Sequence, residues 1–345
     1  MSQQYPETMW ASVLTPDRRI VLEERQTPKP AADEVLIKVG SVGVCGSDVH
    51  YYKEGRIGDF VVEAPLILGH EAGGTIVAVG EGVPADRVGE RVAIEPQRCC
   101  RVCEYCRSGR YNLCPSMEFY ATPPIDGAFC EYVTIQADFA FTVSDSISDD
   151  AAGLIEPLSV GIASIRKAKV TPGSSLLIAG GGPIGIITAQ VARVYGATEI
   201  VITDTNLTRR DIAARYATES LDPAALGGRT FDNFIDCSGA TPAIVDGINR
   251  TRPDGVVVLV GMGADTLPLP VGAVTMRELS VTGIFRYTQT WPVAIRMLEA
   301  GLIELDALVT ERYGLDEVET ALAAPVADGG LKRVVVPGAR GLGGR

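Results

Sequence analysis

The sequence predicts an α/β protein in which a doubly wound parallel sheet is combined with a β-rich domain. Residues 1 to about 157 contain short β-branched runs separated by Gly and Pro turns. From about residue 170 the pattern becomes strand, glycine turn, helix and strand, which is typical of a parallel sheet. A chain of 345 residues is long enough for two domains, each with its own core.

The individual elements follow from hydrophobic patterning. In the N-terminal region, strands are expected at 35–39, 74–79 and 90–94. The apolar run from Ser174 to Ala179 lacks alternation, as expected for a strand buried on both faces of a sheet. A helix to about Tyr195 should follow. The remaining expectations are strands at 199–204, 233–237, 256–260, 279–284 and 332–336, an amphipathic helix at 315–323, and a turn-rich, frayed tail at 337–345.

Charge and hydropathy exclude several classes of function. The chain has 31 basic and 43 acidic residues, a net charge of −12, and no Lys/Arg-rich run, so we expect no nucleic acid and no anionic membrane as partner. No stretch approaches the length of a membrane-spanning helix. The N-terminal residues lack the basic and apolar segments of a secretory signal. The sequence therefore predicts a cytoplasmic protein.

Both histidines of the chain lie in one short region whose composition is that of half a metal site. The segment CGSDVH begins at Cys45, and the segment GHEAGG contains His70 and Glu71. A thiolate, an imidazole and a carboxylate are ligands that zinc takes when one coordination position stays open for water or substrate. Glu156, in the segment IEPL, offers a further carboxylate. The pattern predicts zinc chemistry.

A cluster of cysteines predicts a second, closed metal site. Two C-x2-C steps and one C-x7-C step separate its members, and four thiolates so spaced can enclose one tetrahedral ion. The four are Cys100, Cys103, Cys106 and Cys114, in a lobe at about 96–116. Disulfides are the alternative, but the reducing compartment expected here favours metal. Cys99 is next to the lobe and is not needed as a ligand. Cys130 and Cys237 are expected to be small core residues.

A glycine-rich turn after the first buried strand predicts a dinucleotide site. Gly180, Gly182 and Gly185 form a G-x-G-x-x-G pattern, and Pro183 and Ile184 begin the expected helix. The glycines would provide the tight turn, close approach of a pyrophosphate and close packing of helix on strand. The pyrophosphate would lie at the helix N-terminus, where N–H groups and the helix dipole favour an anion. The alternative is a glycine turn that binds no nucleotide.

The residue that ends the second strand favours NAD over NADP. Asp204 can accept hydrogen bonds from both ribose hydroxyls of the adenosine, and the same carboxylate would repel a 2′-phosphate. Arg209 and Arg210 follow, and a nearby arginine can accommodate that phosphate. We expect the effect of Asp204 to be the stronger one.

Together, CGSDVH, GHEAGG, the cysteine lobe and GGGPIG resemble the zinc-dependent medium-chain dehydrogenases over nearly the whole chain. Further segments, GRIGDF, FYATPP, IEPLSVG and FRYTQTWP, are similar to the polyol branch of that family, the sorbitol and xylitol dehydrogenases. The resemblance implies a GroES-like catalytic domain at 1–157, a Rossmann NAD-binding domain at 158–285, and a return to the catalytic domain at 286–345. It also implies zinc and NAD as cofactors, a polyol substrate and a homo-oligomer, with a tetramer favoured.

The resemblance further implies roles for individual residues. The matches to the catalytic zinc ligands are Cys45, His70 and Glu71. Glu156 matches a carboxylate that either binds the metal or holds its water, where classical alcohol dehydrogenases have cysteine. Ser47 and His50 match proton-relay positions, although Ser47 and Asp48 also suit a turn or cap. The matches to positions that line the polyol pocket are Tyr51, Phe119, Arg286 and Tyr287.

The expected function is oxidation of a secondary hydroxyl of a sugar alcohol, such as sorbitol or xylitol, to a ketose, with hydride transfer to NAD. Two alternatives remain open at this point. One is a zinc and NAD dehydrogenase that acts on threonine or an aldose. The other is a non-catalytic protein that binds zinc and nucleotide. The aromatic residues Tyr51, Phe119 and Tyr287 could also be ordinary core residues.

Overall fold

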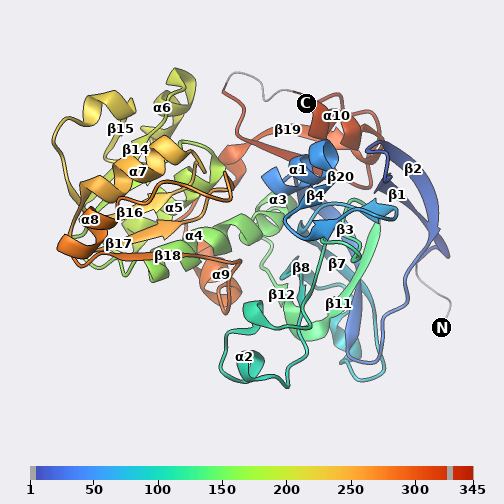
Figure 1. The fold of residues 1–345 in the computed structure, drawn as a ribbon. Coiled ribbons are helices and arrows are strands. Elements are labelled where there is room, and N and C mark those ends of the chain that lie inside the picture. The colour runs from blue at the N-terminus through green and yellow to red at the C-terminus, as the bar shows by residue number, and fades with distance from the viewer. Residues whose placement is uncertain (1–4, 325–328, 345) are drawn as a thin grey trace. The chain divides into compact units, whose positions relative to one another are not determined.

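The chain divides into two compact units in a computed structural model that describes residues 5–324 and 329–344. The first unit comprises Met1–Glu156, Trp291–Glu299 and Glu304–Arg345. The second comprises Pro157–Thr290 and Ala300–Ile303. Figure 1 shows the β-rich first unit and the α/β second unit, and each is described by itself below. No helix within the described ranges has the length and apolar character needed to cross a membrane.

The first unit is built on a seven-stranded sheet that joins the N-terminal region to the last part of the chain. Its strands are, in order, β12 (Ala140–Thr142), β8 (Arg91–Ile94), β7 (Glu71–Val79), β3 (Glu34–Gly43), β20 (Lys332–Val336) and β19 (Val309–Gly314), and β11 (Tyr132–Gln136) also pairs with β3. The pairs are antiparallel, except that β19 and β20 run parallel. The central strand β3 therefore lies between β7 and the much later strand β20.

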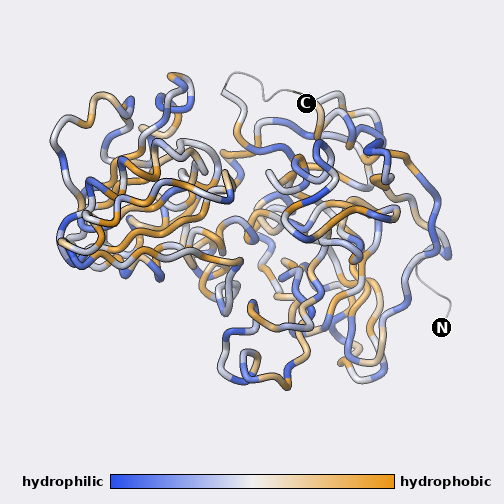
Figure 2. The backbone as a smooth tube through the Cα atoms, in the orientation of Figure 1, coloured by the Kyte–Doolittle hydropathy of each residue, from blue (hydrophilic) through white to orange (hydrophobic). Residues whose placement is uncertain are grey.

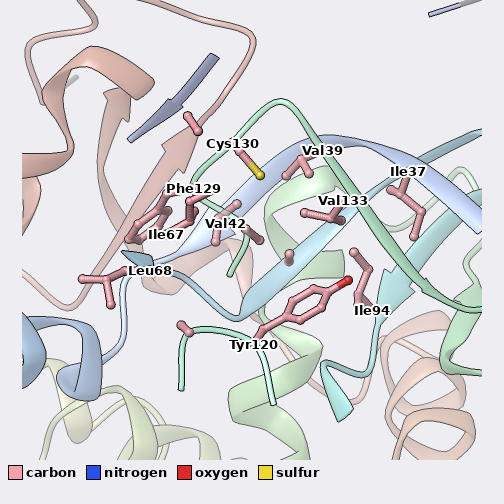
Figure 3. Packing of buried hydrophobic residues seen from close by; sticks show 14 of the residues in the cluster. Ile37, Val39, Val42, Ile67, Leu68, Ile94, Tyr120, Phe129, Cys130 and Val133 are labelled. Atoms are coloured by element: carbon pink, nitrogen blue, oxygen red, sulfur yellow. The ribbon is translucent and has the colours of Figure 1, made fainter. Parts of the chain in front are cut away.

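Smaller sheets and short helices complete this unit. The sheets are β2 (Ile20–Gln26), β1 (Thr8–Leu14) and β6 (Leu66–Ile67); β9 (Gln97–Arg98) with β10 (Glu118–Phe119); and β4 (Arg56–Ile57) with β5 (Phe60–Val61). The helices are α1 (Gly46–Glu54), α2 (Glu104–Arg107), α3 (Asp149–Gly153), α9 (Trp291–Glu299) and α10 (Val318–Ala323). Figure 3 shows the core, where Val39 and Val42 of β3 pack with Phe129 and Cys130. Cys130 is a buried core residue, as predicted, and burial raises the pKa of its thiol.

The second unit contains a six-stranded parallel sheet. Its order is β15 (Glu219–Leu221), β14 (Glu199–Thr203), β13 (Ser175–Ala179), β16 (Phe231–Asp236), β17 (Thr251–Leu259) and β18 (Ser280–Gly283). Its helices are α5 (Pro183–Val194), α6 (Leu207–Ala213), α7 (Thr241–Arg250) and α8 (Val271–Met276), and α4 (Ile155–Lys167) enters the unit from the first. Every residue of β13 is buried, and Figure 2 shows the hydrophobic colour of these strands. The order reverses between β13 and β16, as in doubly wound sheets.

Residues 337–344 of the C-terminal tail are rich in turns, as predicted. The backbone N–H groups of Gly341, Leu342 and Gly343 donate hydrogen bonds of 2.7–3.1 Å to the carboxylates of Asp316 and Glu317. Both acceptors lie in a 3-10 turn, Leu315–Glu317, that precedes α10 and takes the place of the first part of the helix expected at 315–323. The helix expected at 315–323 therefore begins later, at Val318.

Candidate functional site

Three of the expected zinc ligands come together in the first unit. Cys45 precedes α1, His70 precedes β7, and Glu71 is the first residue of β7. One ligand atom from each lies within 4.8 Å of the other two. His70 and Glu71 are buried, and Cys45 is half-buried. This set of donors fits a zinc ion with one open coordination position.

Asp48 connects the two segments that carry these ligands. It is fully buried in the first turn of α1. One carboxylate oxygen accepts the backbone N–H of Cys45 at 2.9 Å, and the other accepts that of Gly69 at 2.9 Å and lies 3.7 Å from His70 Nδ1. Burial opposes protonation of His70, but the Asp48 carboxylate and the Cys45 sulfur outweigh it and raise the pKa of the imidazole well above its usual range. The surroundings of the cluster therefore favour a cation.

Lys332, on β20, is a buried partner of the cluster that sequence reasoning missed. Its Nζ lies 2.6 Å from both carboxylate oxygens of Glu71 and donates a hydrogen bond to Oε1. Burial disfavours its charge, but Glu71, Cys45 and Glu156 outweigh burial and raise the pKa of the ammonium. A signal was present in the sequence: Lys332 and Arg333 are two cations at the start of an otherwise apolar strand, which burial alone would disfavour.

The other expected catalytic residues lie on two helices. Glu156 is buried near the start of α4 and is not part of the three-residue cluster, although its charge contributes to the raised pKa of Lys332. Ser47 and His50 are one helical turn apart on α1, Ser47 half-buried and His50 exposed. This spacing places Ser47 and His50 on the same face of the helix.

The residues expected to line a substrate pocket divide between the units. Tyr51 on α1 and Phe119 on β10 are buried in the first unit. The ring of Phe119 lies 5.5 Å from that of His70, so Phe119 borders the metal cluster. Arg286 and Tyr287 follow β18 in the second unit, Arg286 half-buried and Tyr287 buried.

The four lobe cysteines also come together. Their sulfur atoms lie within 4.8 Å of one another, and the eight cysteines of the chain, all among the described residues, are free thiols. The backbone N–H groups of Cys103 and Cys106 point at the sulfurs of Cys100 and Cys103, at 3.4 and 3.5 Å. Hydrogen bonds from backbone N–H groups, that of Cys103 first, lower the pKa of Cys100 to about 6, whereas burial raises the pKa of Cys106 and Cys114. Such sulfurs fit a closed zinc site, and Cys99 is buried outside the cluster.

A buried carboxyl group beside the lobe is the second residue that sequence reasoning missed. Glu95, directly after β8, is 1% exposed. Its Oε1 accepts hydrogen bonds of 2.8 Å from the hydroxyl of Tyr111, which lies in the lobe, and from the amide of Gln97. Burial, reinforced by Asp138 and Glu156, raises the pKa of Glu95 to about 8. Glu95 is therefore a neutral acid at neutral pH.

The glycine-rich turn of the second unit has the geometry of a phosphate cradle. Gly180 directly follows β13 and has a φ of +104°, a left-handed conformation that favours glycine. A Cβ at Gly185 would lie 1.9 Å from the carbonyl oxygen of Gly180, so the helix and the turn approach closely. A Cβ at Gly182, just before Pro183 opens α5, would meet nothing within 4 Å. This open space at a helix N-terminus fits a pyrophosphate.

Asp204 lies directly after β14 and holds this turn. One carboxylate oxygen accepts the backbone N–H of Gly181 at 2.8 Å, and the other accepts that of Asn206 at 2.8 Å. Arg210 donates to the Asp204 carbonyl at 2.8 Å and to Asp222 at 3.1 Å, whereas the half-buried Arg209 lies 4.0 Å from the Asp204 carboxylate. Arg209 is thus the arginine placed to respond to a change at position 204.

Comparison with known proteins assigns the chain to a class. Residues 31–145 match the model of the alcohol dehydrogenase GroES-like domain, and residues 183–300 match that of a zinc-binding dehydrogenase. The solved complex of an alcohol dehydrogenase from Escherichia coli CFT073 with NADH superimposes with a TM-score of 0.90 at 28% identity and covers 96% of this chain and 100% of that one. The predicted fold class, a GroES-like domain combined with a Rossmann-type sheet, is confirmed.

The particular relatives are named as dehydrogenases of a polyol or of a related hydroxy compound. Sorbitol dehydrogenase from Bacillus subtilis is 40% identical over 334 residues, which span 93% of this chain and 95% of the relative. The structure of L-idonate 5-dehydrogenase from Escherichia coli K-12 has a TM-score of 0.89 at 27% identity and covers 96% of this chain and 98% of that one. The chain therefore belongs to the zinc-binding alcohol dehydrogenase family, and its predicted resemblance to the polyol branch is confirmed.

Proposed function

We propose that the protein oxidises a secondary hydroxyl of a sugar alcohol to a ketose and passes hydride to NAD. The observation that carries the proposal is the buried cluster of Cys45, His70 and Glu71, which has the donor set of an open zinc site. The 40% identity with a sorbitol dehydrogenase over 93% of the chain supports a polyol as the substrate class. The proposed domains are a catalytic one at 1–157 and 286–345 and an NAD-binding one at 158–285.

The chain's own residues supply the remaining parts of the reaction. Zinc, when bound, polarises the substrate hydroxyl and so eases its deprotonation. We propose that Glu156 holds a water or substrate hydroxyl rather than the metal, because the cluster already fills three positions and catalysis needs the fourth. Ser47 and His50 would carry the released proton from the half-buried to the exposed side of α1. Cys100, Cys103, Cys106 and Cys114 would hold a second, structural zinc.

The second unit would bind the nucleotide. The pyrophosphate is assigned to the turn from Gly180 to Gly185, with the N-terminus of the 12-residue helix α5 behind it. The adenosine ribose is assigned to Asp204, whose carboxylate favours two hydroxyls over a phosphate. Polyol hydroxyls need polar partners, and the residues proposed to contact the substrate are Tyr51, Phe119, Arg286 and Tyr287.

We further propose a homo-oligomer, with a tetramer favoured. Its support is β18, an edge strand whose outer side pairs with no described strand. Exposed apolar side chains lie near this edge, on α8 and directly after β18: Val271, Met276 and Phe285. An edge strand with apolar neighbours is suited to pairing with another chain. The free thiols support a reducing compartment such as the cytoplasm.

The test is an assay of sorbitol, xylitol and other polyols with NAD and with NADP, combined with metal analysis. We expect NAD-dependent oxidation of at least one polyol and two zinc ions per chain. Cys45→Ser should remove the zinc that chelators extract first, whereas Cys103→Ser should remove the other and lower stability. Oxidation of threonine or an aldose alone would overturn the polyol assignment. A single zinc that persists in Cys45→Ser, with no oxidation of any alcohol, would leave only a binding function.

A further inference from the structure

The contact between Glu71 and Lys332 crosses an intervening strand. In the seven-stranded sheet, β3 lies between β7, which carries Glu71, and β20, which carries Lys332. The register pairs Gly43 of β3 with Glu71 on one side and with Val334 on the other. The Glu71 carboxylate must therefore pass over β3 at Gly43 to reach the ammonium group.

Gly43 makes this passage possible. A Cβ at this position would lie 2.0 Å from Glu71 Oε2 and 3.0 Å from Leu154 Cδ2. Real Cβ atoms do not approach other atoms to 2.0 Å, so any larger residue would displace the carboxylate. The absence of a side chain at Gly43 is thus what lets a ligand on β7 and a cation on β20 meet.

The ion pair of Lys332 and Glu71 is buried, and its two charges are opposite and equal. The side chains of Lys332 and Glu71 are 7% and 1% exposed, and Nζ lies 2.6 Å from both carboxylate oxygens. Cys45 and Glu156 are two further acidic groups near the ammonium. A buried ion pair contributes little net stability, but removal of one partner leaves an uncompensated charge. A role at the neighbouring metal cluster explains why the pair lies here.

We propose that Lys332, reaching across Gly43, is a positioning residue for the metal ligand Glu71. Its ammonium fixes the direction of the carboxylate toward Cys45 and His70 and so sets the affinity of the cluster for zinc. The inference rests on the proposed function and adds a contribution from the C-terminal strand to the metal site. Groups that hold a metal ligand in place typically change metal affinity 10–100-fold when they are replaced.

The experiment compares four full-length proteins. Lys332→Met removes the charge at similar length, and Gly43→Ala keeps every charge but blocks the passage. Lys38→Met is the matched control, because Lys38 is an exposed lysine on β3, the strand that contains Gly43. Zinc affinity is measured by competition with a chelator, and the visible spectrum is recorded after cobalt replaces the labile zinc. Retention of the lobe zinc shows that each variant is folded.

Lys332→Met and Gly43→Ala should each weaken the labile site about 10–100-fold and alter its cobalt spectrum. Lys38→Met should match the unmodified protein in both measurements. Zinc affinity that is unchanged or higher in Lys332→Met, with an unaltered cobalt spectrum, would overturn the proposal. If Lys332→Met does not fold, Gly43→Ala decides the question by the same two readouts. Failure of the unmodified protein to bind a labile zinc would instead refute the proposed function.

Discussion

Replacement of Glu95 by glutamine should change how stability depends on pH. The pKa of this carboxyl group is raised from an ordinary 4.5 to about 8, chiefly by burial. Between these values the folded protein binds a proton that the unfolded chain has released. The contribution of Glu95 to stability is therefore complete below pH 4.5 and is lost as the pH rises through 8.

The size of the effect follows from the shift. The rise from 4.5 to about 8, at about 1.36 kcal/mol per pH unit, corresponds to a cost of up to roughly 5 kcal/mol for the ionised folded state. Glu95→Gln keeps the size of the side chain and an oxygen that still accepts from Tyr111 and Gln97, but it cannot ionise. The variant should be close to the unmodified protein at pH 5 and gain on it by up to roughly 5 kcal/mol by pH 9.

Urea unfolding of both zinc-loaded proteins, measured from pH 5 to pH 9, tests this expectation. The quantity of interest is the difference between their free energies of unfolding, because other groups titrate equally in both. Glu104→Gln is the matched control, because it makes the same substitution at an exposed glutamate of the same lobe. A difference for Glu95→Gln that stays constant from pH 5 to pH 9 would refute the reasoning.

Two further expectations concern the reaction. Asp204→Ala should raise KM for NAD and lower KM for NADP, with Arg209 as the new partner of the 2′-phosphate. It should also cost about 1 kcal/mol of stability, because the hydrogen bond from Gly181 is lost. An unmodified enzyme that prefers NADP would contradict this expectation. Glu156→Gln should lower kcat at least about 100-fold and leave the affinity for NAD unchanged. If Glu156 acts through water, the zinc content should also stay unchanged. Normal turnover would show that Glu156 has only a structural role.

Features that depend on neighbours in sequence were predictable. The parallel sheet could be predicted because β13 and β14 are apolar runs on either side of a glycine turn and a helix. The two ligand clusters could be predicted because their donor types and spacings are local. The strand expected at 35–39 in fact runs over Glu34–Gly43. Gly40 and Gly43 made the segment resemble a turn, yet β3 continues because Ser41–Gly43 pair with residues of β7.

Features that depend on strand pairing were not predictable. Lys332 is 261 residues from Glu71, and only the order β7, β3, β20 brings the two together. Glu95 follows an apolar strand, where a carboxylate suggests exposure to solvent. Its burial results from the lobe that supplies Tyr111, 16 residues further on. The charge of Lys332 depends on Glu71, and the proton of Glu95 depends on burial. No local pattern in the sequence encodes either.

The discontinuity of the first unit has a consequence for synthesis. The central sheet needs β19 and β20, which come after all its other strands in the sequence, whereas the second unit is almost entirely one continuous stretch, Pro157–Thr290. Domains generally fold as units while the chain is being made, in the order in which they are completed. In this protein the middle of the chain is therefore complete before its beginning. The sheet of the first unit can be completed only after the second unit has been made, when β20 pairs with β3 and β19 with β20.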